Sequence, residues 1–215
     1  EIIKPEKITP TVIEFIDIAG LVKDAHKGEG LGNQFLAEIR NCDAVLEIIR
    51  DFEDPKVENI LGETRPEERI ETIETEFLMK DFESLENGLS KLEKDKKTGD
   101  KRTLKKFELL EKLKIAVSQG KPISEIELTD EEKSGIKEYQ FLTQKTIIYL
   151  LNSDKSDQDP LINFTYLKMN LKGEEEISEL SEKEQEELGV NSQLDKLIKS
   201  CYNVLNLITF FTIAG

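Results

Sequence analysis

Residues 12–49, VIEFIDIAGLVKDAHKGEGLGNQFLAEIRNCDAVLEII, decide the fold of this chain. Residues 12–17 are mostly β-branched or aromatic, which predicts a buried strand that ends in a loop near Gly20. A glycine-rich loop and apolar residues at helical spacing up to Ile39 follow, and residues 44–49 form another apolar run of strand length. A strand, loop, helix and strand in this order make a βαβ unit, so we predict an α/β fold with a parallel sheet.

Two further strands and a late helix are predicted downstream. Residues 146–151 and 164–169 have strand character, and each run ends in a polar loop. Ser181 with Glu184 forms a capping box, which is typical of a helix start. Apolar residues then share one helical face, at Leu194, Leu197, Ile198, Cys201 and Leu205.

The middle of the chain has the periodicity of long helices. Pro66 followed by two glutamates is typical of a first helical turn. Two apolar stripes separated by a polar break at residues 94–102 predict an antiparallel hairpin or short coiled coil, and Thr129 with Glu132 caps a third helix. The stripes comprise Ile70, Ile73, Phe77, Leu78, Leu85, Leu89 and Leu92, then Leu104, Phe107, Leu110, Leu113 and Val117.

These patterns divide the chain into three parts. We expect the first part of the core at residues 1–62, a helical insertion at residues 63–143, and the second part of the core at residues 144–215.

Composition excludes several classes of function. The 215 residues include 45 acidic and 30 basic side chains, a balance of −15, and the pI is near 4.7. Such a chain repels the phosphate backbone, so we expect no DNA partner. No apolar run is long enough to span a membrane. Two distant cysteines, Cys42 and Cys201, and the single His26 do not make a disulfide framework or zinc site, which fits a reducing, cytoplasmic compartment.

Asp17 and Gly20 form an Asp-x-x-Gly motif at the predicted strand end. In phosphate-handling sheets such a carboxylate meets Mg²⁺ through water, and the glycine lets its backbone N–H approach a terminal phosphate. The motif alone is also compatible with an ordinary turn after a strand.

A longer match makes the motif specific. Residues 17–33, DIAGLVKDAHKGEGLGN, and 34–54, QFLAEIRNCDAVLEIIRDFED, closely resemble the YchF or Obg-like ATPase family of P-loop proteins. The resemblance continues through residues 66–85 and 194–212. It implies a P-loop sheet interrupted by a helical, coiled-coil-containing domain and followed by a TGS domain. It also implies Mg²⁺-dependent hydrolysis of ATP or GTP and association with ribosomes.

The resemblance assigns Asp17 and Gly20 to switch II, with Asp17 supporting Mg²⁺ through water. Leu21 stands where many GTPases carry a water-orienting glutamine, and an alkane side chain cannot position water. The position of the histidine proposed as catalytic in the family corresponds to Asn59. An asparagine can hold a water molecule but does not titrate.

Two segments correspond to the base-reading motifs of the family. Asn152 occupies the asparagine of Asn-x-x-Glu, but Lys155 replaces the acid, and an ammonium cannot accept hydrogen bonds from a base. Asp154 or Asp157 is an alternative acceptor, and the backbone of Ser153 can meet an adenine edge. The family's Ser-Ala-Lys motif corresponds to Asn170, Leu171 and Lys172, where the aliphatic stem of the lysine would stack on the base.

No G-x-x-x-x-G-K-[ST] motif, which would cradle the β- and γ-phosphates, occurs in these residues. The family places that loop just before the point at which this sequence starts, so we expect truncation there. Glycines 28, 30 and 32 belong to the switch II region and do not replace it.

Two hypotheses of function follow. The first is an ATP- or GTP-hydrolysing enzyme coupled to the ribosome. The second is a non-hydrolysing, nucleotide-dependent adaptor whose hairpin docks on ribosomal or protein partners. The basic cluster at residues 94–106 is either a solvated turn or a contact for ribosomal RNA.

Overall fold

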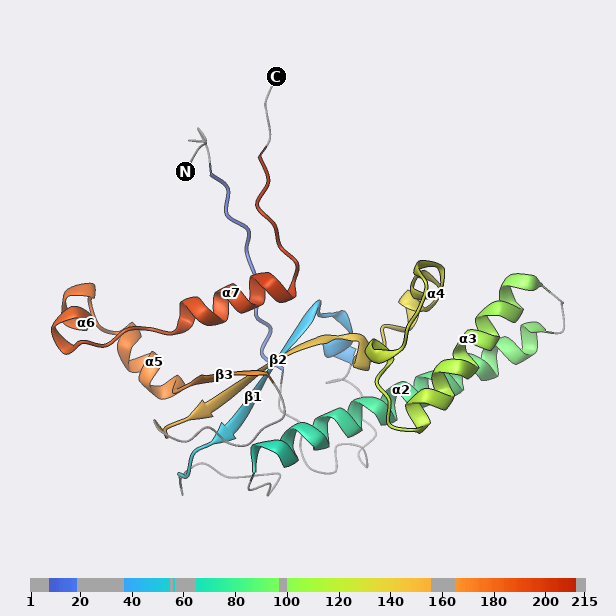
Figure 1. Cartoon of the computed structure of the whole chain (residues 1–215), viewed down its shortest axis with the longest axis horizontal. Coiled ribbons are helices and arrows are strands. Elements are labelled where there is room, and N and C mark those ends of the chain that lie inside the picture. Colours follow the sequence, from blue (N-terminus) through green and yellow to red (C-terminus); the bar gives the residue numbers. More distant parts are fainter. Residues whose placement is uncertain are drawn as a thin grey trace.

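A computed structural model describes residues 8–18, 37–54, 56, 65–96, 100–155 and 165–211 (Figure 1). Within these ranges three strands form one parallel sheet in the order β1-β2-β3. The strands are β1 at Ala44–Asp51, β2 at Thr146–Ser153 and β3 at Tyr166–Met169. The predicted α/β fold with a parallel sheet is therefore confirmed.

The strand register brings the carboxyl ends of all three strands to one edge. Asp51 of β1 lies opposite Ser153 of β2, and Asn152 lies opposite Met169 of β3. Because ligands of open α/β sheets bind outside this edge, it is the first place to look for a functional site.

Helices cover both faces of the sheet (Figure 1). Helix α2, Pro66–Lys96, packs on one face, where Ile70 meets Ile49, Tyr149 and Leu151. Helix α7, Leu194–Val204, covers the other face, where Leu197 and Cys201 meet Leu150 and Met169. Alternate residues of β2 thus face opposite helices, as the two-residue period of a strand requires.

The predicted helical hairpin is present. Helix α3, Lys101–Ser118, packs against α2, and Asp100 caps it by accepting a hydrogen bond from the Thr103 N–H at 3.1 Å. The hairpin core is apolar and contains Leu85, Leu109, Leu110, Leu113, Val117, Ile123, Ile136 and Phe141. The hairpin projects well beyond the sheet (Figure 1).

Short elements return the chain from the hairpin to the sheet. They are η1 at Ile123–Glu125, α4 at Asp130–Ile136, η2 at Lys137–Tyr139 and η3 at Leu142–Gln144. After β3 come α5 at Leu171–Ser178 and α6 at Glu182–Leu188. Both predicted capping boxes, Thr129 with Glu132 and Ser181 with Glu184, are confirmed.

The predicted strand at residues 12–17 is wrong. Residues 8–18 contain no strand, and Val12, Phe15 and Ile16 are 87%, 59% and 58% exposed. The β propensity is local, but a strand also needs a partner that pairs with its backbone. This segment instead anchors two side chains separately: Ile13 packs in the cluster under α7, and Ile18 packs in the cluster around Phe77.

Two further predictions, the helix before β1 and the strand at residues 164–169, agree in part with the structure. The helix expected before β1 is helical at residues 37–41, and its earlier residues lie outside the described ranges. The strand expected at 164–169 begins at Tyr166. No helix in the described part of the chain has the length and hydropathy needed to cross a bilayer.

Candidate functional site

The carboxyl edge of the sheet joins the two segments that the sequence singled out for base contact. The side-chain oxygen of Asn152, at the end of β2, accepts a hydrogen bond from the Leu171 N–H at 3.1 Å. Asn170 caps α5 by accepting from the Gly173 N–H at 3.0 Å. Asn152 and the triplet Asn170, Leu171 and Lys172 therefore lie together, although they are 18 or more positions apart in sequence.

Lys155 lies on the other side of β2, beside β1. Its ammonium donates to Asp51 Oδ1 at 2.9 Å, and the Ser153 hydroxyl donates to Asp51 Oδ2 at 2.8 Å. The hydrogen bond and negative charge of Asp51 raise the pKa of Lys155 above its ordinary value. Asp154, the alternative acceptor, is exposed, and Asp157 lies outside the described residues. The sequence did not predict that Asp51 is the partner of Lys155, because the whole hairpin separates β1 from β2 in the chain.

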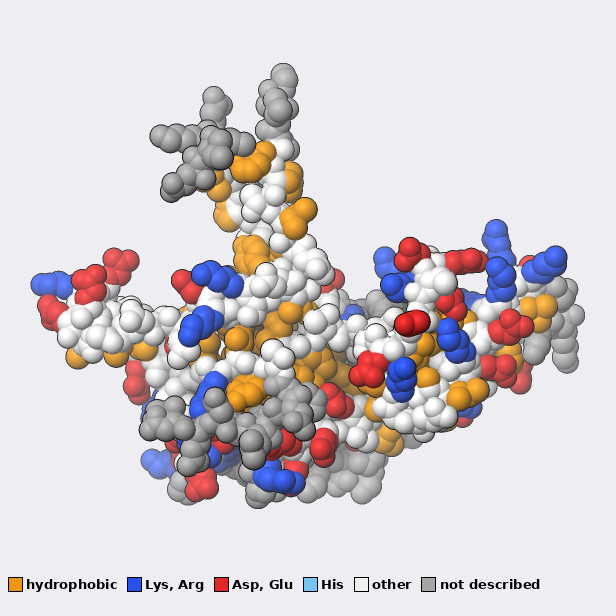
Figure 2. Space-filling model, viewed as in Figure 1, with side chains coloured by type: hydrophobic (Ala, Val, Ile, Leu, Met, Phe, Trp, Pro, Cys, Tyr) orange, Lys and Arg blue, Asp and Glu red, His pale blue; other side chains and the backbone are white. Residues whose placement is uncertain are grey.

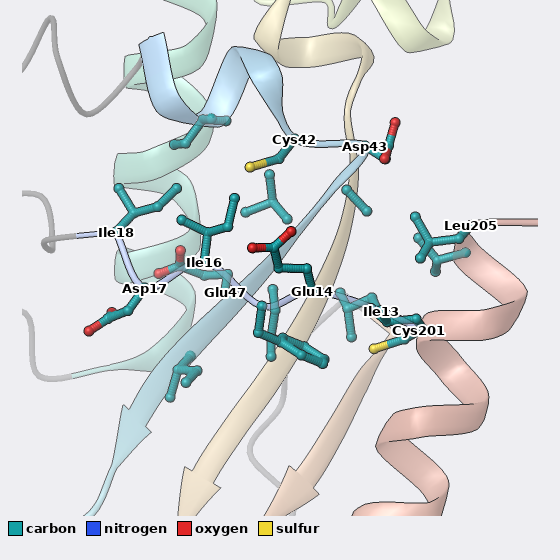
Figure 3. Close-up of a pocket in the computed structure, with 18 of the residues that line it drawn as sticks. Ile13, Glu14, Ile16, Asp17, Ile18, Cys42, Asp43, Glu47, Cys201 and Leu205 are labelled. Carbon is teal, nitrogen blue, oxygen red and sulfur yellow. The ribbon is translucent and has the colours of Figure 1, made fainter. Parts of the chain in front are cut away.

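Asp17 lies away from this edge. It lines a cavity of about 770 Å³ between residues 12–18, β1 and α7, and Figure 3 shows its carboxylate directed away from the centre. Asn152 does not line this cavity. The described residues thus place Asp17 and the predicted base-reading segments in two locations. Gly20, Leu21 and Asn59 lie outside the described residues.

The cavity is lined by both apolar and acidic residues. The residues that line it include apolar Ile39 and Phe77 and acidic Glu14, Asp43 and Glu47. No group of three or more His, Cys, Asp or Glu side chains in the described ranges could hold a metal ion. Mg²⁺ needs only one or two carboxylates when phosphates supply other ligands, and the role of Asp17 through water stays a prediction.

A buried carboxylate that the sequence analysis missed holds the hairpin to the core. Asp81 of α2 is fully buried and accepts from the N–H groups of Leu142 and Thr143, each at 2.8 Å, and from the Thr143 hydroxyl at 2.7 Å. Burial raises the pKa of Asp81, and these hydrogen bonds oppose the shift. The available signal was its position, four residues from Phe77 and from Leu85 on an apolar stripe.

Two cations complete this attachment, which we call the joint: Arg40, Asp81, Thr143 and Lys145 with their partners. Arg40 follows the glycine-rich segment and donates to the Tyr139 carbonyl and the Ser84 hydroxyl, both at 2.8 Å. Lys145 donates to the carbonyls of Arg40 and Cys42, at 2.7 and 2.6 Å. The joint therefore connects three segments: the helical turn at 37–41, α2, and the chain entering β2.

The free end of the hairpin carries exposed cations. Lys101 and Arg102 are exposed in the first turn of α3, and Lys91 and Lys94 are exposed on α2. Further along α3, acidic residues from the returning chain neutralise the lysines: Lys105 pairs with Glu131 at 3.4 Å, and Lys106 pairs with Glu138. Figure 2 shows this alternation of basic and acidic side chains. The predicted basic cluster is thus concentrated near the hairpin turn.

Comparison with known proteins agrees with the fold. Residues 2–81 match the family model described as 50S ribosome-binding GTPase. The match covers 80 of the 215 residues and agrees with the α/β class that the parallel sheet defines.

Curated relatives match nearly the whole of this chain. The chain is 39% identical to the ribosome-binding ATPase YchF of Bacillus subtilis (strain 168) and 37% identical to that of Pasteurella multocida (strain Pm70). Each match covers 99% of this chain and 63% of the relative. The structure of the Schizosaccharomyces pombe YchF GTPase matches with a TM-score of 0.72 at 29% identity, covering 92% of this chain and 59% of that one. The chain is thus homologous to YchF proteins over nearly its whole length.

The chain spans slightly less than two thirds of the length of these curated relatives. The activity, substrates and partners of the whole relatives therefore apply to this chain only as proposals.

Proposed function

We propose that this chain contributes to a YchF-type nucleoside triphosphatase that binds and hydrolyses ATP, with GTP as the alternative substrate. The observation that carries the proposal is the hydrogen bond from the Leu171 N–H to Asn152, which joins the two base-reading segments at the carboxyl edge of a parallel sheet. The names of the relatives, ribosome-binding ATPase and GTPase, support the same class of chemistry.

In the proposed reaction, a water oxygen bonds to the γ-phosphorus as the bond to the β-phosphate oxygen breaks in line with it. The nucleoside diphosphate leaves, and the proton of the water passes to the released phosphate. Asn152 and Ser153 orient the base, and the stem of exposed Lys172 covers its face. Asp17, which the described residues place apart from Asn152, would hold Mg²⁺ through water, and the metal would supply charge neutralisation when bound. Gly20 lets the backbone approach the phosphate. Leu21 cannot activate the attacking water, and Asn59 can hold a water molecule without accepting its proton.

The test of the enzyme hypothesis uses the intact protein. ATP and GTP binding is measured by displacement of a fluorescent nucleotide, and turnover is measured separately by phosphate release. We expect Asp17→Ala to lower Mg²⁺-dependent turnover at least about tenfold, because one group that positions the metal is removed. Asp43→Ala is the matched control, since Asp43 is another exposed carboxylate that lines the same cavity. Equal turnover in both variants would contradict the role of Asp17.

The second candidate is a nucleotide-dependent adaptor that docks on the ribosome through the hairpin. Lys101 and Arg102 favour it, because cations in the first turn of a helix oppose the helix dipole and so cost α3 stability. Their placement is better explained by an anionic partner such as ribosomal RNA. A ribosome-associated role would place the protein in the cytoplasm.

Charge reversal tests the adaptor. Lys101→Glu with Arg102→Glu should weaken co-sedimentation with ribosomes and reduce its salt dependence, because fewer phosphate contacts remain. Lys121→Glu with Lys199→Glu is the control, as both lysines are exposed elsewhere. Nucleotide binding without phosphate release, together with ribosome binding, would favour the adaptor over the enzyme. Unchanged co-sedimentation after charge reversal at Lys101 and Arg102 would show that this end of the hairpin does not contact the ribosome.

A further inference from the structure

The inference concerns base choice at the proposed nucleotide site and rests on the proposed function. Its starting point is a polar cluster that links β1 to the chain just after β2. Asp51 has a side chain that is 9% exposed, and Ser153 is 4% exposed. Asp51 accepts hydrogen bonds from the Lys155 ammonium at 2.9 Å and from the Ser153 hydroxyl at 2.8 Å. The Ser153 oxygen also accepts from the Lys155 N–H at 3.2 Å. Both carboxylate oxygens of Asp51 are therefore used within the protein.

The cluster directs Lys155 away from the base-reading segments. Strand β2 lies between β1 and β3 in the sheet. Asn152 bonds toward the β3 side, to the start of α5, whereas Lys155 bonds toward the β1 side, to Asp51. The two side chains, three positions apart, thus reach to opposite neighbours of the same strand. The Lys155 side chain is 47% exposed, so about half of it lies in solvent. It is therefore free to move if Asp51 is removed.

We propose that Asp51 is a positioning residue for base selection, which holds the Lys155 ammonium away from the base contacted by Asn152. The consequence follows from the base edges. Guanine presents two acceptors, O6 and N7, to a cation, whereas adenine presents the N6 amino donor beside N7. An ammonium released into the site therefore favours guanine and repels adenine. Asp51 suppresses that preference, and the lysine at the acidic position of the motif does not make the site select guanine.

A double-mutant cycle in the intact protein tests this role. The variants are Asp51→Ala, Lys155→Met and the double variant, and the readout is the ratio of GTP affinity to ATP affinity. Asp51→Ala should shift the ratio toward GTP by roughly three- to tenfold, the scale of one base-edge contact. The double variant should return to the wild-type ratio, because the shift requires the ammonium. Asp51→Asn replaces Asp51→Ala if the alanine variant does not fold.

A merely structural Asp51 would give a different result. Loss of local order would weaken ATP and GTP binding equally, and an unchanged ratio in Asp51→Ala overturns the proposal. A ratio that stays shifted in the double variant also overturns it, since the effect would then not pass through Lys155.

A second measurement checks the ion pair without nucleotide. Acetylation of individual lysines, followed by mass spectrometry, should show Lys155 reacting several-fold faster in Asp51→Ala than in wild type, because the free amine becomes more populated. Lys121, an exposed lysine far from the cluster, is the internal reference. Equal Lys155 reactivity in the two proteins would contradict the ion pair between Lys155 and Asp51 in solution. Wild-type protein that binds neither nucleotide refutes the proposed function and, with it, the role in base choice, whereas a failed ratio shift refutes this inference alone.

Discussion

The joint and the candidate site differ in how far their polar side chains are buried and hydrogen-bonded. At the joint, Asp81 is fully buried and each carboxylate oxygen accepts backbone or hydroxyl donors. Among the predicted site residues, Asp17 and Lys172 are exposed, and Asn152 is partly exposed and accepts a hydrogen bond from the Leu171 N–H. A buried carboxylate that is fully satisfied anchors structure, whereas exposed polar groups remain available to a ligand. The comparison predicts that mutations will separate stability from activity.

The largest effect is expected at Asp81. Asp81→Ala leaves the buried N–H of Leu142 and the partly buried N–H and hydroxyl of Thr143 without their acceptor, so we expect the free energy of unfolding to fall by about 3–5 kcal/mol. Urea denaturation followed by circular dichroism measures it. Glu83→Ala, which removes an exposed partner of Lys80 on the same helix, is the control and should cost under about 1 kcal/mol. Similar losses in the two variants would show that Asp81 does not anchor the hairpin.

Arg40 tests whether the joint connects the hairpin to the turn at residues 37–41. Arg40→Ala removes hydrogen bonds to the Tyr139 carbonyl and the Ser84 hydroxyl, and we expect a loss of about 2 kcal/mol. Amide hydrogen exchange should also accelerate around residues 139–145. Arg40→Lys keeps the charge but not the fork that reaches both partners, so an intermediate effect is expected. Unchanged amide hydrogen exchange around residues 139–145 in Arg40→Ala would show that Arg40 does not connect the hairpin to this turn.

The cap of α4 gives a smaller effect with a pH signature. Thr129→Ala removes the acceptor for the Glu132 N–H and should cost about 1 kcal/mol at neutral pH. The backbone hydrogen bond from Thr129 holds the pKa of Glu132 below its usual range, so the Glu132 contribution is present above the ordinary carboxyl pKa. It is lost as the pH falls through the folded-state value. Thermal denaturation from pH 7 to pH 3 should show the difference between wild type and Glu132→Gln shrinking; a constant difference would contradict the assignment.

The smallest effect on stability is expected at Asp17, an exposed carboxylate that contrasts with the buried Asp81. Because Asp17 is exposed, Asp17→Ala should change the free energy of unfolding by less than about 0.5 kcal/mol. The same variant is expected to lose turnover. Urea denaturation run beside the phosphate-release assay checks both. A large loss of stability would mean that Asp17 is structural, and the contrast with Asp81 would disappear.

Local patterns predicted much of the fold. The apolar stripes of the hairpin, the capping boxes and the runs at β1 and β2 were identified because helices and strands repeat with different periods. The adjacency of Asn152 to residues 170–172 was implied only by the family resemblance. The strand expected at residues 12–17 was wrong, because side-chain pattern does not report whether a backbone partner is present.

The sequence by itself determined most of the element types and the class of fold, and it indicated the resemblance to YchF proteins. These depend on periodicity, capping residues and a long motif, which are all local in the chain. Only the tertiary structure decided that Asp81 anchors the hairpin, that Asp51 holds Lys155, and that Asn152 bonds to the start of α5. Each of these contacts joins residues at least 19 positions apart. Their partners are set by the register of the sheet and by helix packing, which no local pattern encodes.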